Sequence, residues 1–388
     1  MKIVIPDDYQ DMVDRLECFA LIRHHDVVRY REPARDLSEL VAHLADADVV
    51  VAIRERVKFS HALLERLPKL KLIALVGRNS RSIDFAACTE LGIPVATGTS
   101  NSPVAPAELA LALILASRRN VALEAERMKR GDWPCTLSHR LRGSTLGIFG
   151  LGAIGQLVAE GGRGLGMEIL VWGRDSSLEN AEAAGYARAA SKQVLFERSD
   201  VLSLHVRLTR ETHGIVGADD LDRMKPTALL VNTARAELIA PGALFAALRK
   251  GRPGYAAIDV YEHEPVTDHP FLSMPNVLCT PHLGWAEWDN FSARRSSRSW
   301  RLSKGCRCGL RTPKCGREIE LAFGRAGAQR LNLFRGSVMR DLILQIAGRL
   351  RGVPRQGGGN GSTHYASRGR NDGGCLVITA CFCSGVWG

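Results

Sequence analysis

Apolar residues fall into two series of short runs, and amphipathic segments separate the runs. In the first series, segments such as "SELVAHLADA" and "HALLERLPKL" have apolar residues at three-to-four spacing, which is typical of helices. The nearly continuous apolar runs between them are typical of strands covered on both faces of a parallel sheet. The predicted strands of this series span residues 2–6, 48–53, 71–77 and 93–97.

A second series follows a long apolar segment, which predicts a helix from Pro106 to Met128 that links two domains. Helical patterns again separate the apolar runs. Six strands in about 140 residues suit a complete doubly wound dinucleotide-binding domain. The predicted strands of the second series span residues 145–150, 168–173, 200–206, 228–234, 255–260 and 276–280.

Charge and cysteine content separate the last part of the chain from the rest. The 388 residues carry a net charge of +11, but residues 291–388 hold 18 of the 52 Lys and Arg and only 4 of the 41 Asp and Glu. Residues 1–290 therefore have a net charge of about −3, as in an ordinary enzyme, and the basic excess is no argument for a nucleic-acid partner. Sparse cysteines there, and an N-terminus that begins directly with a strand pattern, predict a cytoplasmic protein without a membrane span.

The segment "TLGIFGLGAIG" is the strongest local motif. Gly150, Gly152 and Gly155 form G-x-G-x-x-G directly after a predicted strand and directly before a predicted helix. In this context the glycines allow a tight turn, close approach to a pyrophosphate and close helix–strand packing. The free N–H groups of the helix start favour phosphate binding. The motif therefore predicts a dinucleotide site.

The end of the next predicted strand should contain the group that recognises the adenosine ribose. It reads Gly173-Arg174-Asp175. An acidic residue at this strand end would favour NAD, whereas Gly173 with Arg174 provides room and charge for the 2′-phosphate of NADP. Asp175 could still bind the ribose hydroxyl, or the segment could be a solvated loop. The cofactor is predicted to be NAD or NADP, with a preference for NADP.

Three further segments place ionisable residues at strand ends, where a doubly wound sheet binds its ligand. Arg235 follows one strand, Glu264 lies in "DVYEHEP", and His282 lies in "TPHLGW". Reduction of a 2-keto acid needs a proton donor and a cation for the carboxylate. His282 can be the acid/base, with Glu264 stabilising the protonated ring and fixing its tautomer, and Arg235 can bind the carboxylate and polarise the carbonyl. Each residue alone is more typical of a solvated loop.

Together, the glycine segment, "VNTAR", "DVYEHEP" and "TPHLGW" resemble the D-isomer-specific 2-hydroxyacid dehydrogenase family, and "SIDFAACTELGIPVATG" extends the resemblance upstream. The resemblance covers roughly residues 30–290. It implies an α/β fold with two doubly wound parallel-sheet domains, a flavodoxin-like substrate domain and a Rossmann NAD(P) domain. The composition of the C-terminal tail, which lacks strand patterns, predicts that the tail is irregular and disordered. The expected domains are residues 1–105, residues 106–290 with the linking helix, and the tail at residues 291–388.

The resemblance also implies an Arg–Glu–His catalytic triad of Arg235, Glu264 and His282, and a set of ligand contacts. Arg54, Gly77 and Arg78 are the expected substrate residues, and Arg54 is the weaker candidate because its position is more typical of a surface charge. The expected cofactor contacts, besides the three glycines and Arg174, are Ala153, Ile154, Thr212, Thr233, Ala234 and Asp259.

Two departures from the family pattern affect the cofactor prediction. Gly173 replaces the acidic ribose-binding residue, and Arg207 replaces a proline beside the expected adenosine site. The predicted partners are a small 2-keto or 2-hydroxy acid such as glyoxylate or hydroxypyruvate, and a second copy of the chain. No metal, nucleic acid or membrane is expected. The alternatives are a cofactor-sensing protein similar to the corepressors of this fold, and a degraded, inactive family member.

The family pattern ends soon after His282, where the chain becomes rich in Arg, Ser, Gly and Cys. A family member would continue into a helix that returns to the first domain. GC-rich DNA read out of frame gives such a composition, so we hypothesise that the chain from about residue 292 is a frameshifted translation. Resequencing the DNA around codon 291 tests this hypothesis, and an intact frame there would contradict it.

Overall fold

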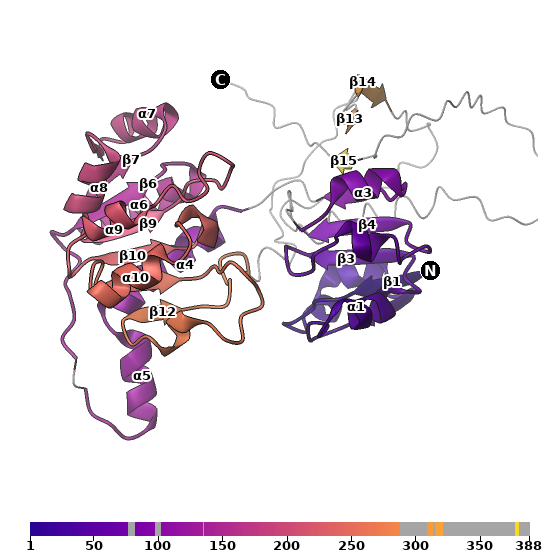
Figure 1. The fold of residues 1–388 in the computed structure, drawn as a ribbon, viewed down its shortest axis with the longest axis horizontal. Helices are drawn as coiled ribbons and strands as arrows, with labels where there is room; N and C mark the ends of the chain where they lie inside the picture. Colours follow the sequence, from indigo (N-terminus) through magenta and orange to yellow (C-terminus); the bar gives the residue numbers. More distant parts are fainter. Residues whose placement is uncertain are drawn as a thin grey trace, which may run out of the picture. The chain divides into compact units, whose positions relative to one another are not determined.

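The structure is a computed structural model that describes residues 1–76, 82–97, 102–134 and 136–287, and the backbone of three short strands further on. The chain divides into two compact units, Met1–Asn101 with Trp288–Gly388, and Ser102–Glu287. Each unit contains a parallel sheet with helices around it (Figure 1). The predicted α/β class with two doubly wound sheets is confirmed.

The sheet of the first unit has the strand order β15-β5-β4-β3-β1-β2, in which β5 to β2 follow the flavodoxin-like order. Its 3-10 helices are Val13–Arg15 and Glu17–Leu21, and its α-helices are α1 (Leu37–Leu44), α2 (His61–Leu64) and α3 (Phe85–Glu90). Its strands are β1 (Lys2–Ile5), β2 (Asp26–Arg29), β3 (Val49–Ile53), β4 (Leu72–Val76), β5 (Val95–Thr97) and β15 (Val377–Thr379).

The second unit has a seven-stranded parallel sheet in the order β12-β11-β10-β9-β6-β7-β8. Its strands are β6 (Thr145–Phe149), β7 (Glu168–Trp172), β8 (Ala187–Arg188), β9 (Val201–Leu204), β10 (Leu229–Asn232), β11 (Tyr255–Ile258) and β12 (Val277–Cys279). Its α-helices are α4 (Val104–Arg118), α5 (Val121–Lys129), α6 (Ala153–Gly164), α7 (Asp175–Ala183), α8 (Lys192–Arg198), α9 (Ala218–Asp222) and α10 (Ala243–Lys250). Two 3-10 helices span Ala236–Leu238 and Pro270–Ser273.

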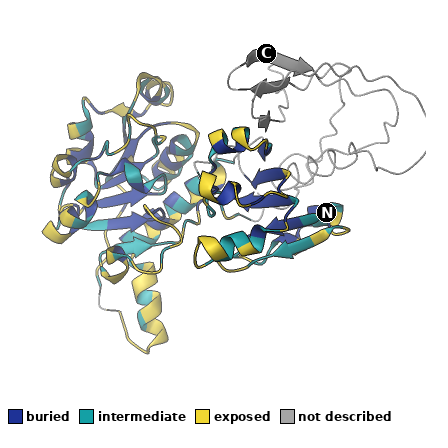
Figure 2. Cartoon of the chain, turned by 45° about the vertical axis from the view of Figure 1, so that its right-hand side comes forward, coloured by how far each residue is buried: buried dark blue, intermediate teal, exposed yellow. Residues whose placement is uncertain are grey.

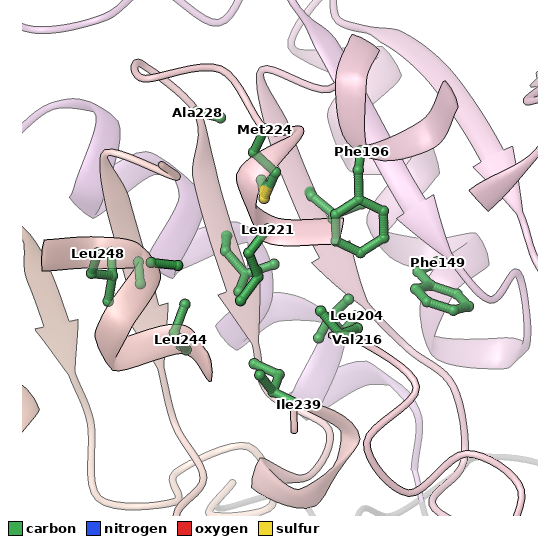
Figure 3. Close-up of a cluster of buried hydrophobic side chains, with 14 of the residues drawn as sticks. Phe149, Phe196, Leu204, Val216, Leu221, Met224, Ala228, Ile239, Leu244 and Leu248 are labelled. Carbon is green, nitrogen blue, oxygen red and sulfur yellow. The ribbon is translucent and has the colours of Figure 1, made fainter. Parts of the chain in front are cut away.

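Successive residues of the central strands of this sheet enter two different cores, as expected for side chains that alternate between faces. Leu230 packs with Phe149, Phe196 and residues of α8, α9 and α10 on one face. Figure 3 shows part of this core, with Phe149 and Phe196 labelled. Its neighbours Leu229 and Val231 pack with residues of α4 and α6 on the other face. The strands are therefore buried on both sides while the outer helix surfaces are exposed (Figure 2), which explains their nearly continuous apolar sequences.

The register of this sheet aligns the last residues of its strands in one row. Phe149 pairs with Trp172 and Leu204, and the row continues through Asn232 and Ile258 to Cys279. Because all the strands are parallel, the segments that follow this row leave the sheet at one edge. The glycine motif and the three predicted catalytic residues are all in these segments, so the sheet itself gathers the site.

Two strands and one helix break differ from the sequence prediction. β2 and β8 were not predicted because both are edge strands whose residues are half or fully exposed, so they lack an apolar run. The helix predicted from Pro106 to Met128 is two helices, α4 and α5, separated at Asn120, which has a left-handed backbone (φ 54°). Asn tolerates this conformation better than most residues, so the prediction of one continuous helix was wrong.

Three short strands lie in the tail, for which the sequence predicted irregular structure: β13 (Gly309–Thr312), β14 (Cys315–Glu320) and β15. β13 and β14 pair antiparallel, and β15 pairs in parallel with β5. The predicted disorder and frameshift of the tail otherwise fall outside the described residues. Among the helices that the structure describes, none is long and apolar enough to cross a membrane.

Candidate active site

The glycine motif follows the carboxyl end of β6. β6 is flanked by β7 and β9, and the strand order of the sheet reverses at this point. Gly150 has a φ of 97°, in the left-handed region, and a Cβ there would approach Val206 Cγ1 to 2.8 Å. Gly155 packs so closely that a Cβ would collide with the carbonyl oxygen of Gly150. These two glycines are therefore required by the turn itself.

Gly152 is different, because a Cβ there would meet no described atom within 4 Å. It is the N-cap of α6, whose first residues, Ala153 and Ile154, have backbone N–H groups without partners in the preceding turn. Open space in front of a helix start accommodates a phosphate group and favours its negative charge. The loop thus has room for a dinucleotide pyrophosphate, and its contacts with one stay a prediction.

The segment after β7 is the expected ribose end of this site. Gly173 is the first residue past β7, and Arg174 is the N-cap of α7. The Arg174 side chain is exposed, and it makes no hydrogen bond or ion pair with the residues that the structure describes. Arg207, in the segment after β9, is also exposed. Since β7 and β9 flank β6, both arginines follow strands next to the glycine loop.

Glu264 and His282 form the central contact at the other half of the sheet edge. Glu264 Oε2 lies 2.6 Å from His282 Nδ1, and Glu264 Oε1 accepts a hydrogen bond from the backbone N–H of Tyr261 at 3.0 Å. Burial would raise the pKa of Glu264, but the hydrogen bond and charge of His282 outweigh it and lower the pKa. The two side chains keep 30% and 24% of their exposure, so a small molecule can still reach them.

Asp259 holds the loop that contains His282, a function that the sequence did not reveal. The side chain is completely buried and accepts hydrogen bonds from the Thr280 hydroxyl and the Leu283 N–H, both at 2.7 Å, and from the Gly284 N–H at 3.0 Å. Burial raises the pKa of Asp259, and these hydrogen bonds oppose the rise. His282 itself has a left-handed backbone (φ 51°), so the three bonds help to maintain an unfavourable loop conformation.

Arg235 follows β10, the next strand in the sheet after β11. Buried Asn232 shapes this turn, since its side-chain amide donates to the Arg235 carbonyl at 2.8 Å and its oxygen accepts from the Ala234 N–H at 3.0 Å. The Arg235 guanidinium donates to the Ala234 carbonyl at 2.6 Å, and its positive charge is one of the causes that lower the pKa of Glu264.

The remaining predicted residues of the second unit also lie in segments that leave the sheet at its carboxyl edge. Thr233 and Ala234 come directly after β10, and Thr212 lies in the segment after β9, where its hydroxyl donates to the Arg207 carbonyl at 2.7 Å. Their contacts with a cofactor stay predictions, as does that of Asp259. No group of three or more metal-binding side chains occurs among the described residues.

Of the predicted substrate residues, Gly77 and Arg78 lie outside the described residues. Arg54 lies at the carboxyl end of β3 in the first unit, with a left-handed backbone (φ 62°). Arg56, two residues further along the chain, donates to the Asp7 carbonyl at 2.5 Å and lies over the Tyr9 ring at 4.3 Å.

Asp7, whose carbonyl accepts the hydrogen bond from Arg56, allows the destabilisation by a buried carboxylate charge to be measured. Its side chain is fully buried, which raises its pKa to about 7, while the charge of Arg56 and a hydrogen bond from the Ile53 N–H oppose the rise. The folded-state pKa thus exceeds the unfolded value, so ionisation destabilises the fold, and stability falls as pH rises from about 4 to about 7.

We therefore expect Asp7→Asn to be more stable than the wild type by about 4 kcal/mol at pH 8, and the difference to vanish near pH 4. Asn keeps the oxygen that accepts from Ile53 but carries no charge. Urea unfolding across this pH range measures the difference. Asp26→Asn, at an exposed position of β2, is the matched control. A difference between Asp7→Asn and wild type that does not change with pH would contradict the expectation.

A glycine loop at the reversal point of a doubly wound sheet, with a helix start directly behind it, defines the class of dinucleotide-binding α/β domains. The sequence comparisons specify the family. A model of the D-isomer specific 2-hydroxyacid dehydrogenase, NAD binding domain, matches residues 111–284. Glyoxylate reductase of Thermococcus litoralis is 34% identical over 274 residues, which cover 68% of this chain and 82% of that protein.

D-3-phosphoglycerate dehydrogenase of Methanocaldococcus jannaschii is 36% identical over 271 residues, and the chain spans about half of its length (52%). Among solved structures, phosphoglycerate oxidoreductase of Vibrio cholerae is 46% identical, with a TM-score of 0.72 over 74% of this chain and 93% of that one. The chain therefore belongs to the D-isomer-specific 2-hydroxyacid dehydrogenase family of NAD-binding oxidoreductases, as the motifs predicted.

Proposed function

We propose that the protein is an NAD(P)-dependent oxidoreductase that reduces a small 2-keto acid to the D-2-hydroxy acid and catalyses the reverse reaction. The observation that carries the proposal is the 2.6 Å contact between Glu264 and His282 at the same sheet edge as the glycine loop. A reduced nicotinamide supplies the hydride when it is bound. The residues of the chain then bind the acid, orient it and provide the proton.

In this proposal His282 is the general acid in reduction and the general base in oxidation. Its Nδ1 is engaged by Glu264, so the proton is transferred at Nε2. Glu264 stabilises the protonated ring and fixes its orientation. Arg235 binds the substrate carboxylate and polarises the carbonyl, where its charge stabilises the developing alkoxide. Asp259 keeps His282 in place through the three hydrogen bonds to its loop.

The substrate is proposed to be a small 2-keto acid such as glyoxylate or hydroxypyruvate, because the relatives include glyoxylate reductases and a glycerate dehydrogenase. Arg54, Gly77 and Arg78 are the proposed substrate residues of the first unit.

An assay of the purified full chain with NADH and NADPH, against glyoxylate, hydroxypyruvate, pyruvate and phosphohydroxypyruvate, tests the proposal through the absorbance of the reduced cofactor. Turnover of at least one acid is the expected result. Cofactor binding without turnover of any acid would instead favour a cofactor-sensing protein. Binding of neither cofactor would contradict the proposal as a whole.

For the cofactor, we propose NADP. Support comes from Gly173, which leaves the ribose end without an acidic side chain, and from the exposed guanidinium groups of Arg174 and Arg207. An Arg binds a phosphate through charge-assisted hydrogen bonds, whereas it gains little from an unmodified ribose.

We expect Arg174→Ala to lower the preference for NADPH over NADH about tenfold, because one charge-assisted contact with the 2′-phosphate is lost. The dissociation constants of both reduced cofactors can be measured from the change in their fluorescence on binding. Arg119→Ala removes the same charge from an exposed position at the end of α4 and should leave the preference unchanged. A preference that is equal in Arg174→Ala and wild type would contradict NADP recognition by this residue.

We also propose that two copies of the chain form a homodimer through α5 and the segment after it. α5 has no buried residue, and large apolar side chains here are exposed, including Met128 (60%), Trp133 (78%) and Leu137 (94%). Figure 2 shows this exposed helix. Burial of these neighbouring apolar side chains against a second copy of the chain would be favourable. Sedimentation velocity of the full chain tests this, and a monomer at micromolar concentration would contradict it.

A further inference from the structure

The backbone of Leu151, the residue between the first two glycines of the motif, is bound by side chains of α7. The backbone N–H of Leu151 donates to Ser177 Oγ at 3.2 Å, and the Leu151 carbonyl accepts from Asn180 Nδ2 at 3.0 Å. Leu151 is completely buried, and Ser177 is 8% exposed. Both backbone polar groups of Leu151 are therefore directed to α7 rather than to the space in front of Gly152.

The same helix begins at the expected ribose end of the site. Arg174 is its N-cap, and the Arg174 carbonyl accepts from the Ser177 N–H at 2.7 Å. Ser177 thus contacts the start of α7 through its backbone and the glycine loop through its side chain. One rigid turn of helix connects the two parts of the cofactor site that recognise different groups, the pyrophosphate and the 2′ position.

Ser177 also limits the residue at position 173. A Cβ on Gly173 would lie 2.9 Å from Ser177 Oγ and 3.0 Å from Ser177 Cβ, closer than packed side chains allow. It would also lie 3.4 Å from the Cα of Gly150. Any larger residue at 173 must displace Ser177, and with it the hydrogen bond to Leu151. The absence of an acidic residue at this position is therefore coupled to the presence of Ser177.

We propose that Ser177 and Asn180 are positioning residues that hold the glycine loop in its cofactor-binding conformation, and that Ser177 excludes an acidic ribose-binding residue at position 173. This inference rests on the proposed cofactor site. It implies that Gly173→Asp, which introduces an acidic side chain for NAD, disrupts the loop instead. Gly173→Asp combined with Ser177→Gly relieves the steric conflict.

The experiment measures binding of NADH and NADPH by fluorescence, together with amide hydrogen exchange of the peptide that contains Leu151, in the full-length chain. The variants are Ser177→Ala, which removes the acceptor, and Asn180→Asp, which removes the donor at nearly constant size. We expect each to weaken binding of both cofactors about tenfold, because the free loop then populates other conformations. Exchange of the Leu151 amide should accelerate, while exchange in β10 stays at the wild-type rate.

Glu179→Gln is the matched control, since Glu179 is an exposed neighbour on the same helix. It should bind both cofactors as the wild type does. Faster exchange in β10 of both Ser177→Ala and Asn180→Asp would mean a general loss of folding and would contradict a local positioning role. Wild-type affinity in Ser177→Ala and Asn180→Asp would overturn the inference alone, whereas a wild-type chain that binds neither cofactor would overturn the proposed function as well.

The exclusion of an acidic residue is tested by the double variant. Gly173→Asp should bind both NADH and NADPH at least tenfold more weakly than the wild type, and Gly173→Asp with Ser177→Gly should recover NADH binding relative to Gly173→Asp. Tighter NADH binding by Gly173→Asp alone would overturn the steric part of the inference.

Discussion

Replacement of His282 by Asn is expected to lower kcat for 2-keto acid reduction by about 10³-fold, the loss typical of a missing general acid. Asn occupies a similar volume and keeps a hydrogen-bonding group next to Glu264, so the loop on Asp259 should persist. The dissociation constant of the reduced cofactor should change less than twofold. Steady-state kinetics with the best acid of the panel, and fluorescence titration of the cofactor, measure these quantities.

His263→Asn is the matched control for His282→Asn. His263 is exposed, lies next to Glu264 in the chain, and should be replaceable with less than a twofold change in kcat. A kcat for His282→Asn within tenfold of the wild type would show that the proton comes from another group. Equal losses in the two variants would point to a disturbed loop rather than to a lost acid.

Replacement of Arg235 by Gln is expected to lower kcat/KM by about 10³-fold, because the variant loses a charge that binds the carboxylate and stabilises the developing alkoxide. The loss should divide between a higher KM and a lower kcat, unlike that of His282→Asn, which should affect kcat. Asn232 binds only the backbone of Arg235 and Ala234, so these bonds of the turn should persist in the variant, which loses the bond from the Arg235 guanidinium to the Ala234 carbonyl.

The control for Arg235→Gln is Arg119→Gln, an exposed position at the end of α4, where no kinetic change is expected. The adjacent Arg118 binds the carbonyl of Thr227, just before β10, which places this helix end at the amino edge of the sheet, opposite the site. A kcat/KM for Arg235→Gln within tenfold of the wild type would contradict the proposed role of the guanidinium.

The sequence predicted the buried strands well because a strand covered on both faces needs an uninterrupted apolar run, and β3 and β10 are such runs. It did not predict β2 and β8, since an edge strand is stabilised mainly by pairing with its neighbour. The break at Asn120 was missed for a related reason. One left-handed residue redirects the chain without changing the apolar pattern on either side.

The candidate residues were identified from their motifs, but their arrangement needed the structure. Arg235, Glu264 and His282 come from three different strand ends, and only the common register of the parallel sheet brings those ends to one edge. The buried Asp259 and Ser177 and the half-buried Asn180 support the site through hydrogen bonds to loop backbone. Partners of this kind depend on side-chain direction and distance, which no spacing in the sequence encodes.

The sequence by itself thus determined the fold class, the glycine loop and the family, because these depend on local patterns: apolar periodicity, glycines at fixed spacing and motifs in a fixed order. Tertiary structure alone decided that Glu264 and His282 lie 2.6 Å apart, that Asp259 holds the His282 loop, and that α7 clamps the peptide at Leu151. Each of these contacts joins residues at least 18 positions apart, and the free energy of packing the whole sheet maintains them.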